Sequence, residues 1–143
     1  MKPILLFALL TILLAGCASL SDLRRSAATK TAEIPGEAVD LSYCTLRAME
    51  VIDSPYVSHL SGHPAHQEFF ITSTHMSDGV TMQQLIGLEL SFKGHDRITT
   101  VELRENWYRD VRDLALEVWP LIERCSQQAP LATAPSAASA SAR

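Results

Sequence analysis

The sequence has no apolar run long enough to cross a lipid bilayer, no excess of basic residues and only 3 cysteines among its 143 residues. A membrane-spanning helix needs about 20 consecutive apolar residues, so no such helix is expected. The 12 lysines and arginines are outnumbered by 16 aspartates and glutamates, which gives a formal net charge of -4. Nucleic-acid-binding domains usually carry a basic excess, so this balance argues against nucleic acid as a partner.

The first 16 residues have the pattern of a secretory signal peptide. Lys2 precedes an apolar run from Ile4 to Ala15, which at about 12 residues is too short to span a bilayer. The run leads into Leu-Ala-Gly-Cys at positions 14–17, and this tetrapeptide resembles the lipobox of bacterial lipoproteins. The resemblance implies that the signal is removed before Cys17 and that Cys17 carries the acyl chains, palmitate among them.

Two or three acyl chains hold a protein durably on a membrane. In lipoproteins of this kind, an aspartate directly after the lipidated cysteine favours retention in the inner membrane, whereas this chain has Ala18 and Ser19. The resemblance therefore implies attachment to the outer membrane on its periplasmic face. It covers only the beginning of the chain and implies nothing about the domain that follows.

Composition divides the mature chain into three parts. Residues 17–37 are mostly small and polar, which predicts a flexible tether with a root-mean-square span of about 25 Å. Within this tether, Arg24 and Arg25 could contact phospholipid headgroups or simply be solvated. Residues 38–126 hold most of the large apolar side chains and form the predicted globular domain. The Ala/Ser/Pro-rich residues 127–143 predict a disordered tail.

Hydrophobic periodicity predicts a small α+β domain. Residues 40–52 favour a helix, although a strand remains an alternative, and a loop is expected to follow. Strand-forming or alternating residues then predict a three-stranded antiparallel meander over 67–75, 82–92 and 97–103, with strand 82–92 half-buried. Apolar residues at three-to-four spacing predict an amphipathic helix that packs on this sheet. These residues are Trp107, Val111, Leu114, Val118, Leu121, Ile122 and Cys125. Asn106 is a plausible cap for this helix, and Pro120 should kink or restart it.

Two cysteines remain once Cys17 is assigned to lipidation. Cys44 and Cys125 lie on the apolar stripes of the two predicted helices, and the periplasm is oxidising, so a disulfide between them is predicted. Two buried free thiols are the alternative. A redox-active pair is not expected, because the C-x-x-C spacing is absent.

Four of the five histidines fall within 17 residues, from His59 to His75. His59, His63 and His66 have a spacing that metal sites sometimes use, and His75 with Met76 could assist. Zinc sites usually need three or four ligands, and no Asp or Glu lies among these residues. A solvated polar loop is therefore the prediction, with a weak zinc or copper site as the alternative.

Other features bear on binding surfaces. Trp119 and Leu116 lie beside the main stripe of the last helix, where they predict either an exposed patch for a partner or burial under a neighbouring segment. Basic residues interleaved with acidic ones predict a solvated face of mixed charge. These basic residues are Arg97, Arg104, Arg109 and Arg112.

The sequence lacks a nucleophile elbow and a phosphate-binding glycine loop, and no paired carboxylates occur in a convincing context. We therefore expect no enzyme and no cofactor. The expected function is that of a lipid-anchored periplasmic lipoprotein that binds another protein of the cell envelope. The alternative is a lipoprotein that binds a metal or a small ligand through the segment from His59 to His66.

Overall fold

The computed structural model describes residues 19–52, 54–76, 84–107 and 109–128. The predicted signal peptide and Cys17 lie outside these residues, as does most of the predicted tail. The elements occur in the order α2 (Leu20–Arg25), β1 (Lys30–Pro35), α3 (Ala38–Met49), β2 (Val57–His63), the 3-10 helix η1 (Pro64–His66), β3 (Glu68–Met76), β4 (Gln84–His95), β5 (Ile98–Glu105) and α4 (Arg109–Gln128).

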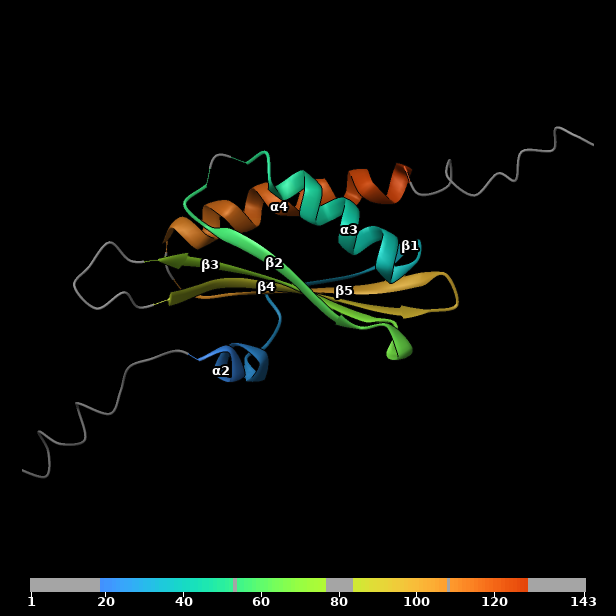
Figure 1. The fold of residues 1–143 in the computed structure, drawn as a ribbon, viewed down its shortest axis with the longest axis horizontal. Coiled ribbons are helices and arrows are strands. Elements are labelled where there is room, and N and C mark those ends of the chain that lie inside the picture. The colour runs from blue at the N-terminus through green and yellow to red at the C-terminus, as the bar shows by residue number, and fades with distance from the viewer. Residues whose placement is uncertain (1–18, 53, 77–83, 108, 129–143) are drawn as a thin grey trace, which may run out of the picture.

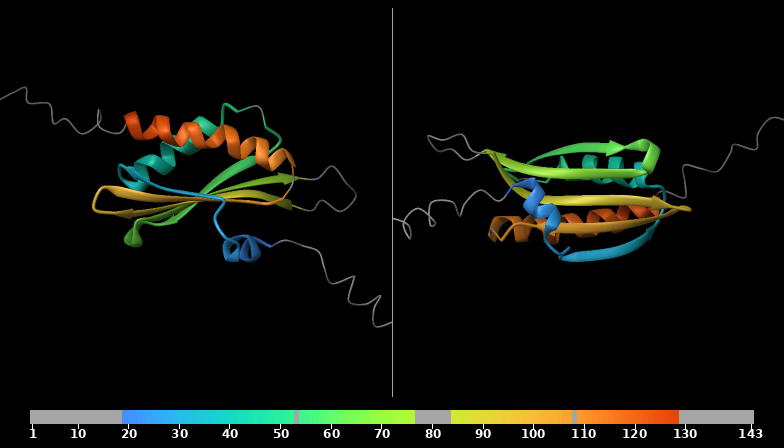
Figure 2. Two further views of the ribbon diagram at one scale, coloured as in Figure 1. Left: turned by 180° about the vertical axis from the view of Figure 1, so that it is seen from behind. Right: turned by 90° about the horizontal axis from the view of Figure 1, so that it is seen from below.

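The five strands form one antiparallel sheet in the order β1-β5-β4-β3-β2 (Figure 1). Helices α3 and α4 cover one face of this sheet, and α2 lies on the opposite face (Figure 2). The predicted α+β class is confirmed. The prediction of three strands is wrong, because β1 and β2 add one further strand at each edge of the predicted meander.

Strand β1 lies in the segment that was predicted to be a flexible tether. It pairs with β5 in a register that places Ala32 opposite Val101 and Ile34 opposite Thr99. Ile34 is 6 % exposed, so its side chain belongs to the core. An edge strand with one large apolar residue gives little sequence signal, since its stability comes from pairing with a distant strand.

Strand β2 replaces the loop that was predicted around the histidines. It pairs with β3 from Val57 opposite Thr74 to His63 opposite Glu68. Gly62 looked like a loop residue, but it is needed for packing: a Cβ atom there would lie 2.6 Å from Cδ1 of Phe69. Close contact with an aromatic ring, and not a turn, therefore explains this glycine.

The two predicted flanking helices are present. Helix α3 settles residues 40–52 as mainly helical, although it ends earlier, at Met49. Helix α4 continues past Pro120 without a new start and extends to Gln128, so residues 127 and 128 of the predicted tail are helical. Its first residue is Arg109, and Asn106 is therefore not its cap. The backbone amide of Asn106 instead donates to the carbonyl of Gly87 at 2.8 Å, which joins this segment to β4.

The core lies between the sheet and the helices α3 and α4. Side chains from alternate positions of the strands meet the apolar stripes of both helices; the fully buried ones include Leu41, Ile71, Leu88, Leu90, Phe92, Val101, Val111, Val118 and Ile122. Trp107, in contrast, is 83 % exposed and does not join the predicted stripe, because α4 begins two residues after it.

The middle of strand β4, residues 88–92, is buried on both faces and is not half-buried as predicted. Leu88, Leu90 and Phe92 face the helices, while Glu89 and Ser91, on the other face, are each 1 % exposed. The second face is covered because α2 lies over β4 and β5 (Figure 2). The residues from α2 to β1, which were predicted to form a tether, are therefore part of the folded domain.

Candidate functional site

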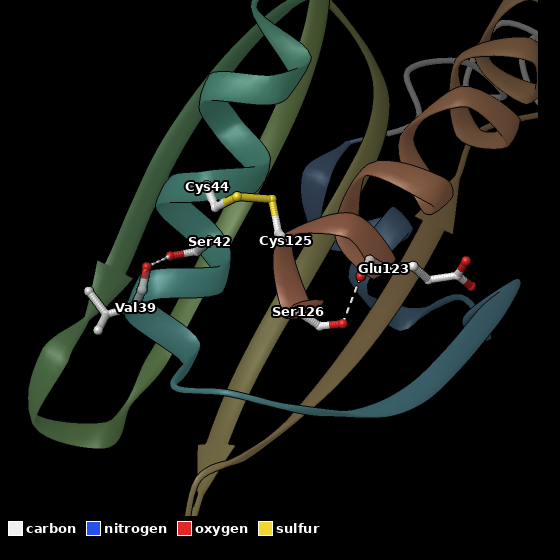
Figure 3. Close-up of a disulfide and its surroundings, with 6 residues drawn as sticks. All are labelled: Val39, Ser42, Cys44, Glu123, Cys125 and Ser126. Atoms are coloured by element: carbon white, nitrogen blue, oxygen red, sulfur yellow. Dashed lines mark hydrogen bonds between the residues drawn. A yellow bond between two sulfur atoms is a disulfide. The ribbon is translucent and has the colours of Figure 1, made fainter. Parts of the chain in front are cut away.

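A disulfide joins the two helices that cover the sheet (Figure 3). Cys44 in α3 is bonded to Cys125 in α4, with their Cα atoms 5.9 Å apart, in agreement with the predicted pairing. Ser42 and Ser126 lie close to the two cysteines and each donates a hydrogen bond to the carbonyl three residues earlier in its own helix. Cys125 is 4 % exposed, so the bond belongs to the core. Its role is structural.

The histidines do not converge on one point. His59 and His63 lie on the exposed edge strand β2, and His66 lies in η1, with the rings of His63 and His66 6.4 Å apart between centroids. His75 is on β3, where its Nδ1 lies 3.0 Å from the carbonyl oxygen of Pro55. Among the described residues, no group of three or more potential metal ligands is present. Met76 belongs to β3, and nothing is described of its side chain.

A cleft of about 390 Å³ lies between α4, the start of β1 and the end of β5. Trp119 is only 5 % exposed, and Leu116, one turn earlier in α4, is 68 % exposed. Of the two predicted alternatives, burial therefore applies to Trp119 and exposure to Leu116. The remaining lining residues are Thr29, Lys30, Leu103, Glu105, Arg112, Ala115, Pro120 and Glu123.

Two polar contacts fix the indole of Trp119 beside this cleft. The ammonium of Lys30, from β1, lies 4.2 Å from the ring centroid, and the indole Nε1 donates a hydrogen bond to Oε1 of Glu123 at 2.9 Å. A cation over an aromatic face is attracted by the ring quadrupole. The segment predicted as a tether thus covers the tryptophan from one side, which explains its burial.

The opposite face of the sheet carries a bidentate ion pair. The guanidinium of Arg24 in α2 donates from Nε and Nη2 to the carboxylate of Glu89 in β4, at 2.7 to 3.0 Å. The same guanidinium lies 4.7 Å from the ring centroid of Phe70. The hydrogen bonds to Glu89 raise the pKa of Arg24 above its ordinary value. Arg24 therefore binds within the fold and is not a solvated linker residue, whereas Arg25 pairs at the surface with Asp22.

A second carboxylate on this face binds several donors. Glu102 accepts hydrogen bonds from Ser91 and Lys93 of β4 and from Arg104 of its own strand. Burial raises the pKa of Glu102, but these hydrogen bonds outweigh it and the net pKa is lowered. The prediction of a solvated face is therefore wrong for Arg104, which also donates to the carbonyl of Ser26 just after α2. Arg97 and Arg112 are exposed as predicted, and the side chain of Arg109 lies outside the described part of the chain.

The cysteine pair could be predicted from the sequence, whereas the Arg24–Glu89 contact and the cleft could not. The two residues of the ion pair are 65 positions apart, and no local pattern connects them.

No helix in the described part of the chain is both long and apolar enough to span a bilayer. Comparison of the chain with protein-family models, curated proteins and solved structures finds no match.

Proposed function

We propose that this protein is a lipid-anchored lipoprotein of the periplasmic face of the outer membrane, where it binds a segment of another envelope protein in the cleft beside α4. The anchor is supported by the signal sequence and by the lipobox-like residues before Cys17. The role is one of binding and not of catalysis. The observation that carries the proposal is the exposure of Leu116 next to the tryptophan-lined cleft.

An exposed leucine alone is common on protein surfaces and indicates nothing. Here, however, the leucine lies at a concave site whose inner wall is formed by a buried indole, and concave apolar sites with a few polar groups are typical of binding sites. Pro120, which also lines the cleft, has no amide hydrogen to donate to the carbonyl of Leu116 within α4.

Charged residues around the cleft define the kind of segment that fits it. Lys30 and Arg112 supply positive charge, and Glu105 and Glu123 supply negative charge. No ion pair between these four residues is present in the described structure. We therefore expect a partner segment with an apolar side chain for the cleft and with charged residues of both signs on either side of it. At about 390 Å³ the cleft accommodates a few side chains and not a folded domain.

A site-specific crosslinking experiment in intact cells tests this proposal. A photo-reactive amino acid placed at Arg112, beside the cleft, should give a discrete adduct with one envelope protein, and Leu116→Ser should abolish this adduct. The same photo-reactive amino acid at Val51, which is 85 % exposed but lies beyond the end of α3, is the matched control and should give no such adduct. An adduct that survives Leu116→Ser, or that forms equally from Val51, contradicts binding at the cleft.

The anchor is tested separately. Metabolic labelling with palmitate should label the wild type, and Cys17→Ala should remove the label and release the protein from the membrane fraction. A chain that partitions into the membrane without labelling contradicts lipidation at Cys17.

Zinc or copper binding is a second and weaker proposal, which rests on the contact between the rings of His63 and His66. Two imidazoles are fewer than the three or four ligands that a zinc site normally uses. Calorimetric titration of the soluble domain with zinc should give binding that His63→Ala abolishes. His95→Ala, the exposed control at the end of β4, should leave the binding unchanged. Identical titrations for all three proteins contradict it.

A further inference from the structure

The segment after the proposed lipidation site is fixed on the sheet almost at once. Only Ala18 and Ser19 lie between Cys17 and the start of α2 at Leu20. Ser19 caps this helix: its side chain accepts from the amide of Asp22, whose carboxylate in turn accepts from the amide of Ser19. The helix is short, but its beginning is well defined.

Three contacts hold α2 on the face of the sheet opposite to α3 and α4. Leu23 is 7 % exposed, Arg24 binds the carboxylate of Glu89, and Arg104 from β5 donates to the carbonyl of Ser26 after the helix. The view in Figure 2 from below shows α2 lying across the strands on this face.

The Arg24–Glu89 ion pair determines where α2 lies on the sheet. The side chain of Glu89 is 1 % exposed while that of Arg24 is 44 % exposed, so the carboxylate is buried beneath the arginine. A buried carboxylate without its partner is strongly unfavourable, and bidentate geometry defines the orientation as well as the distance. Few other positions of α2 on the sheet would satisfy Glu89.

The attached helix shortens the reach of the anchor. A chain spans at most about 3.6 Å per residue, so the two steps from Cys17 to Ser19 cover about 7 Å. If residues 17–29 were instead free up to the start of β1 at Lys30, the same relation over 13 steps gives a reach of about 47 Å. The attachment of α2 therefore decides whether the domain is held at the membrane or moves above it.

We propose that α2 acts as a clamp that holds the domain against the lipid bilayer, with the α2-covered face of the sheet towards the lipid and α3, α4 and the cleft away from it. The surface that this face meets is the bilayer in which the acyl chains of Cys17 are inserted. The inference rests on the proposed lipidation. It goes beyond the proposed function because it assigns an orientation to the domain and a role to Arg24 and Glu89.

Energy transfer from the full-length acylated protein to a headgroup-labelled lipid tests the orientation. The protein is reconstituted in vesicles of phosphatidylethanolamine and phosphatidylglycerol, and a genetically encoded fluorescent amino acid replaces either Ser61 or Glu117. Ser61 is exposed on β2 and lies on the face that carries α2, since its strand partner Phe70 contacts Arg24. Glu117 is exposed on α4, on the other side of the sheet. Transfer should be more efficient from position 61 than from position 117.

Two variants test the clamp itself. Arg24→Ala removes the guanidinium, and Glu89→Gln removes the negative charge and one of the two acceptor oxygens of the same contact. Each should therefore reduce the transfer from position 61 and remove most of the difference between the two positions. Arg25→Ala is the matched control in the same helix, because within the described part of the chain Arg25 pairs only with residues of α2, and it should preserve the difference. Circular dichroism of each variant identifies any that has lost its fold, and the conclusion requires at least one folded variant of the pair.

The outcomes separate the clamp from the anchor. Mass spectrometry of the N-terminal peptide reports whether Cys17 is acylated, and a chain without acylation overturns both the proposed anchor and the clamp. An acylated wild type with equal transfer from both positions overturns the orientation alone. If folded Arg24→Ala and Glu89→Gln keep the wild-type difference, the ion pair is not the clamp.

Discussion

The loss in the free energy of unfolding on removal of the disulfide follows directly from the structure. The bond joins residues 81 positions apart and encloses the second half of α3, β2 to β5 and most of α4. In the chain-entropy relation, a loop of this length lowers the entropy of the unfolded chain enough to stabilise the fold by about 4.5 kcal/mol. Unfolded chains retain some compactness, which reduces this figure. We therefore expect Cys44→Ala/Cys125→Ala to lower the free energy of unfolding by about 3 to 4.5 kcal/mol.

Urea unfolding of residues 18–143, followed by tryptophan fluorescence, measures this difference. Trp119 is buried beside Lys30 and Glu123, so its emission should change on unfolding. A reductant should destabilise the wild type towards the double variant and leave the double variant unchanged, which controls for other effects of the reductant. A loss smaller than about 1 kcal/mol, or a reductant effect on the double variant, would refute the reasoning.

Three further changes test individual residues. Ile34→Ala should lower the free energy of unfolding, measured in urea, by about 2–4 kcal/mol, because Ile34 is buried in β1. Thr31→Ala, at an exposed position of the same strand, should change it by less than about 0.5 kcal/mol. Equal and small effects of the two substitutions would indicate a flexible tether. Glu102 has a lowered pKa in the folded protein, so its stabilising contribution is complete above the ordinary glutamate value of 4.5 and is lost as the pH falls through the lowered one. Urea unfolding below pH 4.5 should therefore show a steeper loss for the wild type than for Glu102→Gln, and parallel losses would contradict this. Pro120→Ala should raise the free energy of thermal unfolding by about 1 kcal/mol or more, because alanine supplies the missing amide donor to α4; a decrease would show that the helix depends on the proline.

The parts of the fold that could be predicted are those with a periodic signal inside one element. In α4, Val111, Leu114 and Val118 repeat at helical spacing, and all three are buried. In β4, Leu88, Leu90 and Phe92 alternate, and all three face the core. The disulfide was also predictable, because the compartment favours oxidation and only two cysteines remain after Cys17.

The parts that could not be predicted depend on partners far away in the sequence. Ile34 in β1 is buried because β5 lies beside it, and residue 34 pairs with residue 99. Arg24 looked solvated, since nothing near it in the sequence indicates Glu89. Strand β2 was mistaken for a loop because Gly62 is a common loop residue, whereas here it makes room for Phe69. Local composition cannot distinguish these cases from true linkers.

The Arg24–Glu89 pair also bears on why the N-terminal segment folds back at all. A buried ion pair adds little net stability, because desolvation of the two charges offsets their attraction. Stability alone therefore does not explain a charged pair on the polar face of β4. What the pair provides is a defined geometry, since two parallel hydrogen bonds allow one orientation of the arginine. A clamp needs such geometry, because the direction in which the cleft faces depends on where α2 is attached.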